Sequence, residues 1–332
     1  HCRADHLYMQ GNLSMGVGVR IAENDFENMH NRIAWNHFFD IRRRSSNGQE
    51  AVQIGQGWFW ELGPQHTLVE HNLFERASGD AEIISSKSRS NILRHNTVRD
   101  CAGAMFVLRF GADTRVEGNW FFGGSGGVRA YGAGHVIVNN YIENGRVGIT
   151  IPNGGADAEG GHFYLAFVNG VVAHNTIVNC REAGISFATP NTHPRIQTQL
   201  PLTDNVFLHN IVIGSQGKLF HDGGSVNTVW QGNIAHATGD AKPGYENPGI
   251  QQVDPKLEQR DGLWRLAADS PAVNASPPIL DGRMLPVVDT DIFGRSRNQT
   301  PDAGCEEFSE VPARYRPLEP KDVGPAWMGG DV

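Results

Sequence analysis

The 332-residue sequence lacks several features that would point to common protein classes. It has no apolar run approaching the roughly 20 residues that a membrane-spanning helix needs. Its net charge of −8 argues against a general affinity for nucleic acid. The four cysteines, Cys2, Cys101, Cys180 and Cys305, are far apart and have no metal-type spacing. We therefore interpret them as buried free thiols, which leave the redox compartment open.

The sequence does contain a recurring asparagine that precedes short apolar segments. Its spacing has a base period of 21–24 residues with three longer intervals near 35, which is typical of a solenoid with loops on some coils. The leucine frame of a leucine-rich repeat is absent, and no amphipathic helix competes with the short β-like segments. We predict an all-β parallel β-helix with an internal asparagine ladder. The predicted ladder positions are Asn12, Asn36, Asn72, Asn96, Asn119, Asn140, Asn175, Asn210 and Asn233.

The composition changes near the end of the repeat. Residues 1–245 carry the coils, whereas 246–332 are richer in Pro, Asp and Arg. We interpret 246–332 as a C-terminal closure with an extended tail rather than an independent domain. The segment 316–320, Arg-Pro-Leu-Glu-Pro, is predicted to be an extended strap.

The segment 79–88 combines two carboxylates with a lysine. On a strand, Asp80 and Glu82 project to the same face, while Lys87 has the opposite parity and requires a bend. Taken alone, this segment is better explained as a salt-bridged turn. The repeat changes that balance, because stacking brings residues one coil apart into contact.

Counting from the ladder asparagines, Asn47, Glu82 and Arg129 share a phase, and Lys87, Arg109 and Arg129 follow one another at about one coil. Two carboxylates and an amide oxygen are hard ligands that suit calcium better than zinc or copper, with water or an anionic ligand completing the shell. We therefore predict one face with an oxygen cluster (Asn47, Asp80 and Glu82) flanked by cations (Lys87, Arg109 and Arg129), which together form an anion-binding trough.

Four segments on this face, 47–55, 81–88, 108–111 and 126–129, resemble polysaccharide lyase family 6, which includes alginate lyases and the dermatan-cleaving chondroitinase B. The resemblance covers roughly residues 15–180. It implies a right-handed parallel β-helix and calcium-assisted β-elimination of a uronate-containing polysaccharide. By the same resemblance, Asn47, Asp80 and Glu82 hold Ca²⁺, Lys87 is the general base and Arg109 the general acid.

The sequence departs from the family pattern at several positions. Asp80 stands where Glu is usual, Gln53 where Arg is common, and Phe110 where His usually follows the catalytic arginine. One extra residue in Ala104–Leu108 requires a bulge if Arg109 is to keep its direction. Candidate substrate-binding residues are Arg129, Tyr131, Arg146 and Gln53, for the first three of which an ordinary surface role has equal weight. Trp58, Phe59 and Trp60 could stack on sugar rings or pack beneath their loop.

The leading hypothesis is a lyase acting on an anionic polysaccharide, with alginate as the first candidate and dermatan or chondroitin sulfate as the alternative. A non-catalytic carbohydrate-binding β-helix is the second hypothesis, favoured by Phe110, Gln53 and the extra residue near Arg109. A hydrolase is the weakest, since no second acidic pair lies on this face. The resemblance implies a secreted or periplasmic protein. Because the sequence begins in mid-pattern without a signal-like segment, we expect further coils, a cap and any export signal to precede His1.

Overall fold

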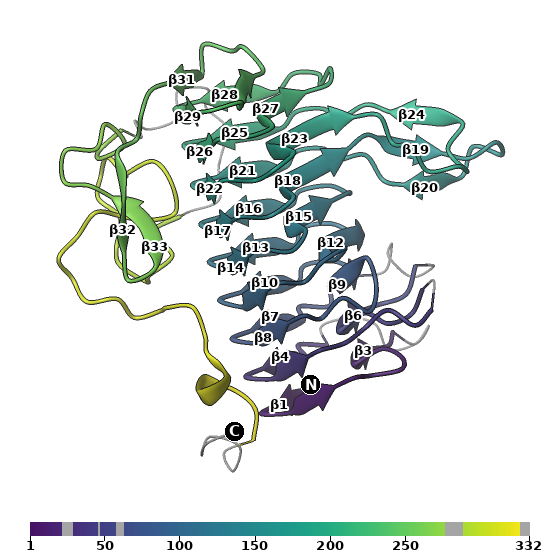
Figure 1. Ribbon diagram of the computed structural model, residues 1–332. Helices are drawn as coiled ribbons and strands as arrows, with labels where there is room; N and C mark the ends of the chain where they lie inside the picture. The colour runs from purple at the N-terminus through teal and green to yellow at the C-terminus, as the bar shows by residue number, and fades with distance from the viewer. Residues whose placement is uncertain (22–28, 46, 58–62, 276–287, 326–332) are drawn as a thin grey trace.

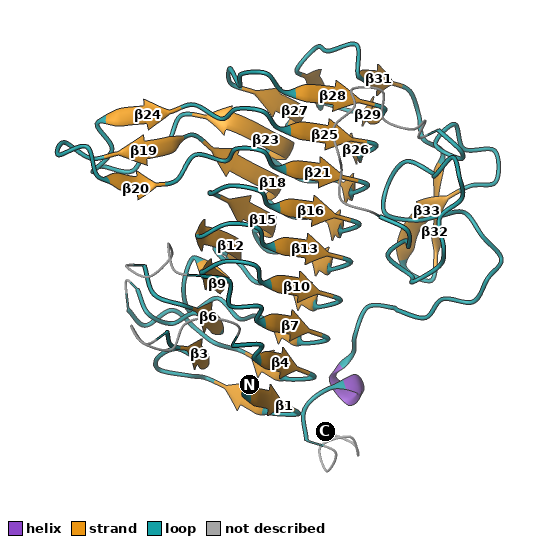
Figure 2. Ribbon diagram, turned by 180° about the vertical axis from the view of Figure 1, so that it is seen from behind, coloured by secondary structure: helices purple, strands orange, loops and turns teal. Residues whose placement is uncertain are grey.

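The computed structural model describes residues 1–21, 29–45, 47–57, 63–275 and 288–325. The chain winds into a parallel β-helix, in which successive coils stack along one axis (Figures 1 and 2). This confirms the predicted all-β solenoid. The coils contribute short strands to three parallel sheets, here named A, B and C.

The strands of each sheet follow one another in chain order. Sheet A contains β1 (Arg3–Asp5), β4 (Arg32–Ala34), β7 (Leu68–Glu70), β10 (Ile92–Arg94), β13 (Arg115–Glu117), β16 (Val136–Val138), β21 (Val171–Ala173), β25 (Val206–Leu208) and β28 (Val229–Gln231). Sheet B contains β2 (Tyr8–Gln10), β5 (His37–Phe39), β8 (Leu73–Glu75), β11 (Thr97–Arg99), β14 (Trp120–Phe122), β17 (Tyr141–Glu143), β22 (Thr176–Val178), β26 (Ile211–Gly214), β29 (Asn233–Ala237) and β31 (Ile250–Gln252). Sheet C contains β3 (Val17–Val19), β6 (Val52–Ile54), β9 (Glu82–Lys87), β12 (Met105–Phe110), β15 (Gly126–Ala130), β18 (Val147–Pro152), β23 (Ala183–Thr189), β27 (Lys218–Asp222) and β30 (Lys242–Gly244).

The hydrophobic core lies inside the coils, because alternate residues of each strand point inward. In sheet C the register aligns Val52, Ile84, Phe106 and Val128 from four successive coils, and all four side chains are fully buried. Stacked aromatic pairs such as Phe38 and Phe74, with ring centroids 4.8 Å apart, extend this order to sheet B. Burial of each such side chain contributes about 1.5–3 kcal/mol, so the stack of coils is held mainly from within.

The asparagine ladder is present from Asn36 to Asn233. Each side-chain amide donates to the next asparagine's Oδ1 at 2.9–3.0 Å, and the ladder residues are fully buried. The residue before each rung has a positive φ, for example 54° at His71 and 62° at Gly118, which explains why His, Gly and Asn recur there. Asn12 was wrongly predicted: the backbone N–H of Leu7 occupies the rung below Asn36.

Two smaller elements extend from the coils. Beyond the ends of β18 and β23, a three-stranded sheet projects outward (Figures 1 and 2), and the C-terminal part includes a hairpin and a short 3-10 helix. The projecting sheet consists of β19 (Gly154–Ala156), β20 (His162–Tyr164) and β24 (Thr198–Leu200). The C-terminal elements are β32 (Leu257–Arg260), β33 (Leu263–Leu266) and η1 (Pro320–Asp322).

The C-terminal part covers the outside of sheet B. Leu263, Ile292 and Phe293 pack against Trp120 and Tyr141 of that sheet. The chain then runs back toward the first coils as an extended strap, defined here as residues 314–324. Its backbone donates from Leu318 to Thr97 Oγ1 at 2.8 Å and from Gly324 to the carbonyl of Trp35, also at 2.8 Å.

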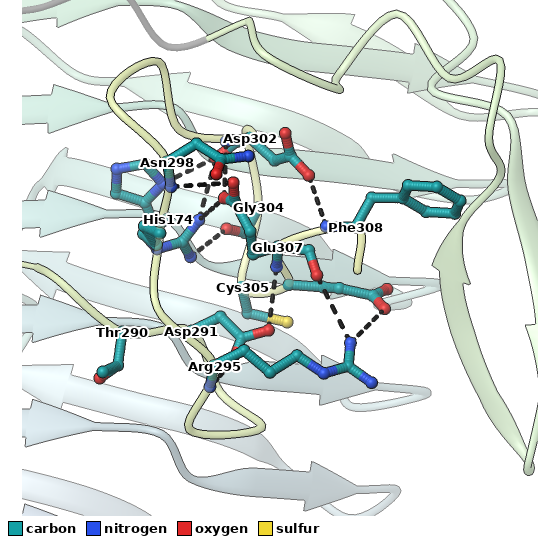
Figure 3. Close-up of polar contacts among 12 residues, drawn as sticks. His174, Thr290, Asp291, Arg295, Asn298, Asp302, Gly304, Cys305, Glu307 and Phe308 are labelled. Atoms are coloured by element: carbon teal, nitrogen blue, oxygen red, sulfur yellow. Dashed lines mark hydrogen bonds and ion pairs between the residues drawn. The ribbon is translucent and has the colours of Figure 1, made fainter. Parts of the chain in front are cut away.

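Buried polar contacts fix the fold of the segment that precedes the strap (Figure 3). The Asp291 carboxylate accepts from the backbone N–H of Glu307 at 3.0 Å, and Asp302 accepts from that of Phe308 at 2.6 Å. His174 of the coil makes a 3.1 Å contact to the Asp302 carbonyl. These carboxylates therefore organise loop backbone.

The cysteines agree only in part with prediction. Cys101, Cys180 and Cys305 are buried free thiols, and burial raises the pKa of each to about 12. Cys2, which precedes β1, is exposed, so that part of the prediction is wrong.

Candidate active site on sheet C

The predicted site residues gather on four neighbouring strands of sheet C. β6, β9, β12 and β15 lie side by side in this order, and their register aligns Gln53, Ser85, Val107 and Arg129 in one row. Residues flanking this row, such as Phe106 and Leu108, belong to the core. The row itself therefore belongs to the outer face, which also carries Lys87, two residues beyond Ser85.

Asp80 is 8% exposed and is held by backbone amides. Its Oδ2 accepts from the N–H of Gly48 at 2.9 Å and of Gln49 at 3.4 Å, and its Oδ1 accepts from Ala81 at 2.6 Å. The loop that carries Asn47 is thereby attached to the start of β9. Asn47 itself is exposed.

Glu50 is a member of this cluster that the sequence analysis missed. It is 2% exposed, and its Oε1 lies 3.5 Å from Lys87 Nζ. Among the described residues its Oε2 has no hydrogen-bond partner. Burial raises the pKa of Glu50; the charge of Lys87 opposes this, and those of Asp80 and Glu82 add to it. Its place one coil before Glu82 was the available signal, since β6 and β9 are adjacent.

Glu82 and Arg129 form an ion pair of 3.4 Å between Oε1 and Nη2. Their predicted common phase is wrong, because Glu82 pairs in register with Met105 whereas Arg129 pairs with Val107. The contact forms because the long arginine side chain reaches back along the sheet. Counting from the ladder could not locate this offset, since a register shift lies between Met105 and Phe106.

The bulge that the sequence analysis requires is present, but it falls at Arg109 itself. Leu108 pairs with Ser86 and Phe110 with Lys87, which leaves Arg109 as the extra residue. The Arg109 guanidinium lies over the ring of Tyr164, 3.9 Å from its centroid, and farther from the rings of Phe110 and Phe163. Tyr164 belongs to β20, so the projecting sheet reaches over the end of β12.

Tyr131 lies under this contact. It is 4% exposed, and its ring centroid is 4.6 Å from that of Tyr164. Burial raises the pKa of Tyr131 to about 12, although Arg129 and Arg109 work in the opposite direction. The Tyr131 hydroxyl therefore keeps its proton at neutral pH and is able to donate a hydrogen bond.

The remaining predicted substrate residues are less central. Gln53 is 7% exposed in the row beside Ser85. Arg146 precedes β18, at the opposite end of the strands from Lys87, and pairs with exposed Glu182 at 2.6 Å. The aromatic run 58–60 lies outside the described residues.

The donor chemistry fits a hard cation, but the geometry is not that of a preformed metal site. Asp80, Glu82 and Glu50 supply carboxylate oxygens, and the orphaned Glu50 oxygen is an additional buried acceptor. Within the described ranges no group of three or more His, Cys, Asp or Glu side chains is arranged to hold a metal. In this state the acids are engaged by backbone amides, Lys87 and Arg129.

Comparison with known families identifies the family of this chain. The family model for chondroitinase B matches residues 1–206, which is more than half of the chain. The chain belongs to the chondroitinase B family. The family resemblance inferred from the carboxylate–lysine segment is thereby confirmed.

Solved structures place this chondroitinase B family member near polysaccharide lyase family 6 (PL6). The PL6 family alginate lyase AlyGC is 25% identical, with a TM-score of 0.73 over 98% of this chain and 40% of that chain. A mannuronic acid specific family 6 lyase from human gut microbiota is 25% identical, with a TM-score of 0.59 over 71% and 54%. The PL6 lyase Pedsa3628 from Pseudopedobacter saltans is 26% identical, with a TM-score of 0.57 over 70% and 63%.

This family member spans less than half the length of AlyGC. None of the curated proteins compared with the sequence matches it. In the part of the chain that the structure describes, no helix has the length and apolar character needed to cross a membrane.

Proposed function

We propose that the chain is a polysaccharide lyase module that cleaves a uronate-containing polysaccharide, with alginate as the first candidate, by calcium-assisted β-elimination. The observation that carries the proposal is the cluster of Lys87, Arg109 and Arg129 beside Asp80 and Glu82 on the outer face of one sheet, in a member of the chondroitinase B family. The lyases with the most extensive structural similarity reported above are named for alginate or mannuronic acid, which favours alginate over sulfated uronans.

In the proposed reaction, Lys87 in its neutral form takes the proton from C5 of the uronate. The electron pair of that C–H bond forms the C4–C5 double bond as the bond from C4 to the glycosidic oxygen breaks. Arg109 faces the leaving oxygen and stabilises its charge, while a proton reaches that oxygen directly or through water. Bound at Asn47, Asp80 and Glu82, calcium would supply positive charge to the uronate carboxylate.

Lys87 and Arg129 each contact a carboxylate of the protein, and substrate binding has to replace these contacts. Lys87 lies beside the Glu50 carboxylate, and Arg129 is paired with Glu82. If Glu82 turns to a cation, Arg129 becomes available for a substrate carboxylate. We therefore propose that cation binding and exposure of the Arg129 guanidinium are one event, with Tyr131 donating to the same substrate.

A non-catalytic carbohydrate-binding β-helix is the second candidate. The observation that favours it is the bulge: Phe110, not Arg109, pairs with Lys87, and the Arg109 guanidinium is stacked on Tyr164. Such a protein would keep an anion-binding face without turnover.

The experiment that separates the two follows ultraviolet absorbance of the unsaturated product. Alginate, mannuronate-rich and guluronate-rich blocks, and dermatan sulfate are each offered with calcium and with a chelator. We expect a calcium-dependent rise on mannuronate-rich alginate. No rise on any polymer from folded protein that still binds one of them would overturn the lyase proposal in favour of the binding module. Action on an extracellular polymer also implies export, which secretion of the full-length protein would test.

A further inference from the structure

A pocket of about 530 Å³ is lined by residues of sheets A and B, of the turns between them and of the strap. No residue lining it belongs to sheet C, so it is separate from the candidate active site. Its wall combines aromatic rings with arginines. The residues that carry the argument are Arg94, Trp35, His71, Trp120, Arg314 and Tyr315.

The aromatic residues form a continuous stack. The rings of Trp35 and His71 are 4.4 Å apart and within 9° of parallel, His71 and His95 are 5.3 Å apart, and Tyr315 of the strap stacks on His95 at 3.9 Å. Burial lowers the pKa of His71 to about 4 and of His95 to about 3. The two imidazoles are therefore uncharged at neutral pH. Because neighbouring rings cover one another's faces, the stack contributes apolar ring edges rather than cations to the pocket wall.

The charge of the pocket comes from arginines. Glu70, at the base, is 3% exposed and accepts from Arg32 Nε and Arg94 Nε, each at 2.8 Å. Although burial works against the charged form, these two arginines hold the pKa of Glu70 below its ordinary value. Their side chains remain 38% and 36% exposed, so each can still donate into the pocket.

The strap adds two more guanidinium groups. Arg316 is paired with Asp322 through two hydrogen bonds of 2.7 and 2.6 Å. Arg314 is exposed, and its guanidinium lies over the Tyr315 ring, 5.1 Å from the centroid, with no ion pair to a described carboxylate. The pocket thus sets four guanidinium groups against two carboxylates in a chain of net charge −8.

A buried donor at the pocket is also unsatisfied. Trp120 is 1% exposed, lines the pocket, and has an indole Nε1–H with no acceptor among the described residues. An unpaired buried donor costs about 1–3 kcal/mol. This donor is independent of the arginines, and an acceptor oxygen of a ligand that reaches the Trp120 side of the pocket would satisfy it.

We propose that this pocket is a second binding site for an acidic oligosaccharide, distinct from the face that cleaves it. The C–H groups of a sugar pack against uncharged aromatic side chains, and guanidinium groups bind carboxylates through paired hydrogen bonds. A uronate offers both, together with hydroxyl acceptors for Trp120. The choice of a uronate rests on the proposed function, whereas the preference for an anionic sugar follows from the pocket. Binding here would hold the polymer on the enzyme between cleavages.

The test is calorimetric titration with a mannuronate tetramer in the presence of a calcium chelator, using Lys87→Ala as the background to prevent turnover. The chelator removes the cation on which the sheet C site is proposed to depend. We expect saturable binding that Arg314→Ala weakens about tenfold, the loss of one charge-assisted contact. Lys256→Ala, which removes a paired surface cation that does not line the pocket, should leave the affinity unchanged.

Several outcomes would overturn the proposal: no binding by folded protein under chelation, equal affinity of the Arg314→Ala and Lys256→Ala variants, or equally tight binding of neutral mannotetraose. Equal competition by acetate would also overturn it, since a plain anion site needs no aromatic stack. Circular dichroism of each variant establishes that it is folded. Chelator-resistant binding weakened by Arg314→Ala, in a protein whose wild type releases no unsaturated product, would support the second site while the lyase proposal fails.

Discussion

The inside of the coils and the outer face of sheet C are built by the same strands and follow different rules. Inside, every rung from Asn36 to Asn233 repeats one residue and one hydrogen bond within 0.1 Å. Outside, each polar side chain has a different partner, and the register shifts at Arg109. Stacking therefore requires the same residue at the equivalent buried position of each coil. The outer positions are not constrained in this way and can carry charged side chains that differ from coil to coil.

The largest predicted effect is a loss of activity from a substitution on the outer face, where no other side chain can replace Lys87. Lys87→Ala should lower kcat/KM for mannuronate-rich alginate about 1000-fold, within the range expected for loss of a general base. The initial rate of absorbance increase measures it. Lys218→Ala, at the start of β27 in the same sheet, should keep wild-type activity. A Lys87→Ala variant with more than a tenth of wild-type activity would remove Lys87 from the mechanism.

Substitutions in the interior of the coils should change the stability of the fold rather than the activity. Asn140 donates to Asn175, Val116 and Val138 at 3.0 Å each and accepts from Asn119, all in the core. Asn140→Ala leaves several of these groups unpaired and should lower the free energy of unfolding by about 3 kcal/mol, measured by urea denaturation. Asn12→Ala, off the ladder, is the control and should change it little. Equal effects of the two substitutions would contradict the ladder's role.

Buried His135, whose ring contacts the carbonyl of Tyr131, should make the stability of the fold depend on pH. His135 is fully buried; its Nδ1 accepts from Thr114 N–H at 3.0 Å, and its other ring nitrogen lies 2.9 Å from the Tyr131 carbonyl. Burial lowers the pKa of His135 to about 4 from 6.5. The stabilising contribution is thus complete above pH 6.5 and is lost as pH falls through 4. Lowering the pH from 7 to 5 should therefore reduce the free energy of unfolding by about 2 kcal/mol.

His135→Gln, which cannot gain the proton, provides the comparison. We expect the difference in unfolding free energy between pH 7 and 5 to shrink by about 2 kcal/mol in this variant. Urea titrations at the two pH values measure both proteins. An unchanged difference would assign the acid sensitivity to other buried groups, such as His174, whose pKa burial also lowers.

The smallest effect concerns the projecting sheet. Tyr164→Ala removes the ring beneath Arg109 and should lower kcat/KM about tenfold, since a desolvated cation–π contact contributes up to about 2 kcal/mol. Tyr164→Phe keeps the ring and should retain most of the activity. The two variants differ in the ring alone, so equal losses would show that the hydroxyl matters instead.

The sequence was sufficient to predict the coils because stacking imposes a period on buried residues. It was also sufficient for the family, since the carboxylates and Lys87 lie in one continuous segment. Glu50 was missed although it lies one coil before Glu82, because the sequence alone does not show that its side chain is buried beside Lys87. Tyr164 was missed because the projecting sheet follows no repeat, and Asn12 was misassigned because the first coil replaces the rung with backbone.

The strap also bears on the order of folding. A solenoid normally forms by nearest-neighbour addition, so each coil needs only the one before it. Here Leu318 and Gly324 bond to Thr97 and Trp35, more than 200 residues earlier in the chain. The coils that contain Trp35 and Thr97 are therefore synthesised more than 200 residues before the strap segment that covers them. A chain whose translation stops between residues 97 and 314 would therefore hold these coils without the strap that covers part of their outer side.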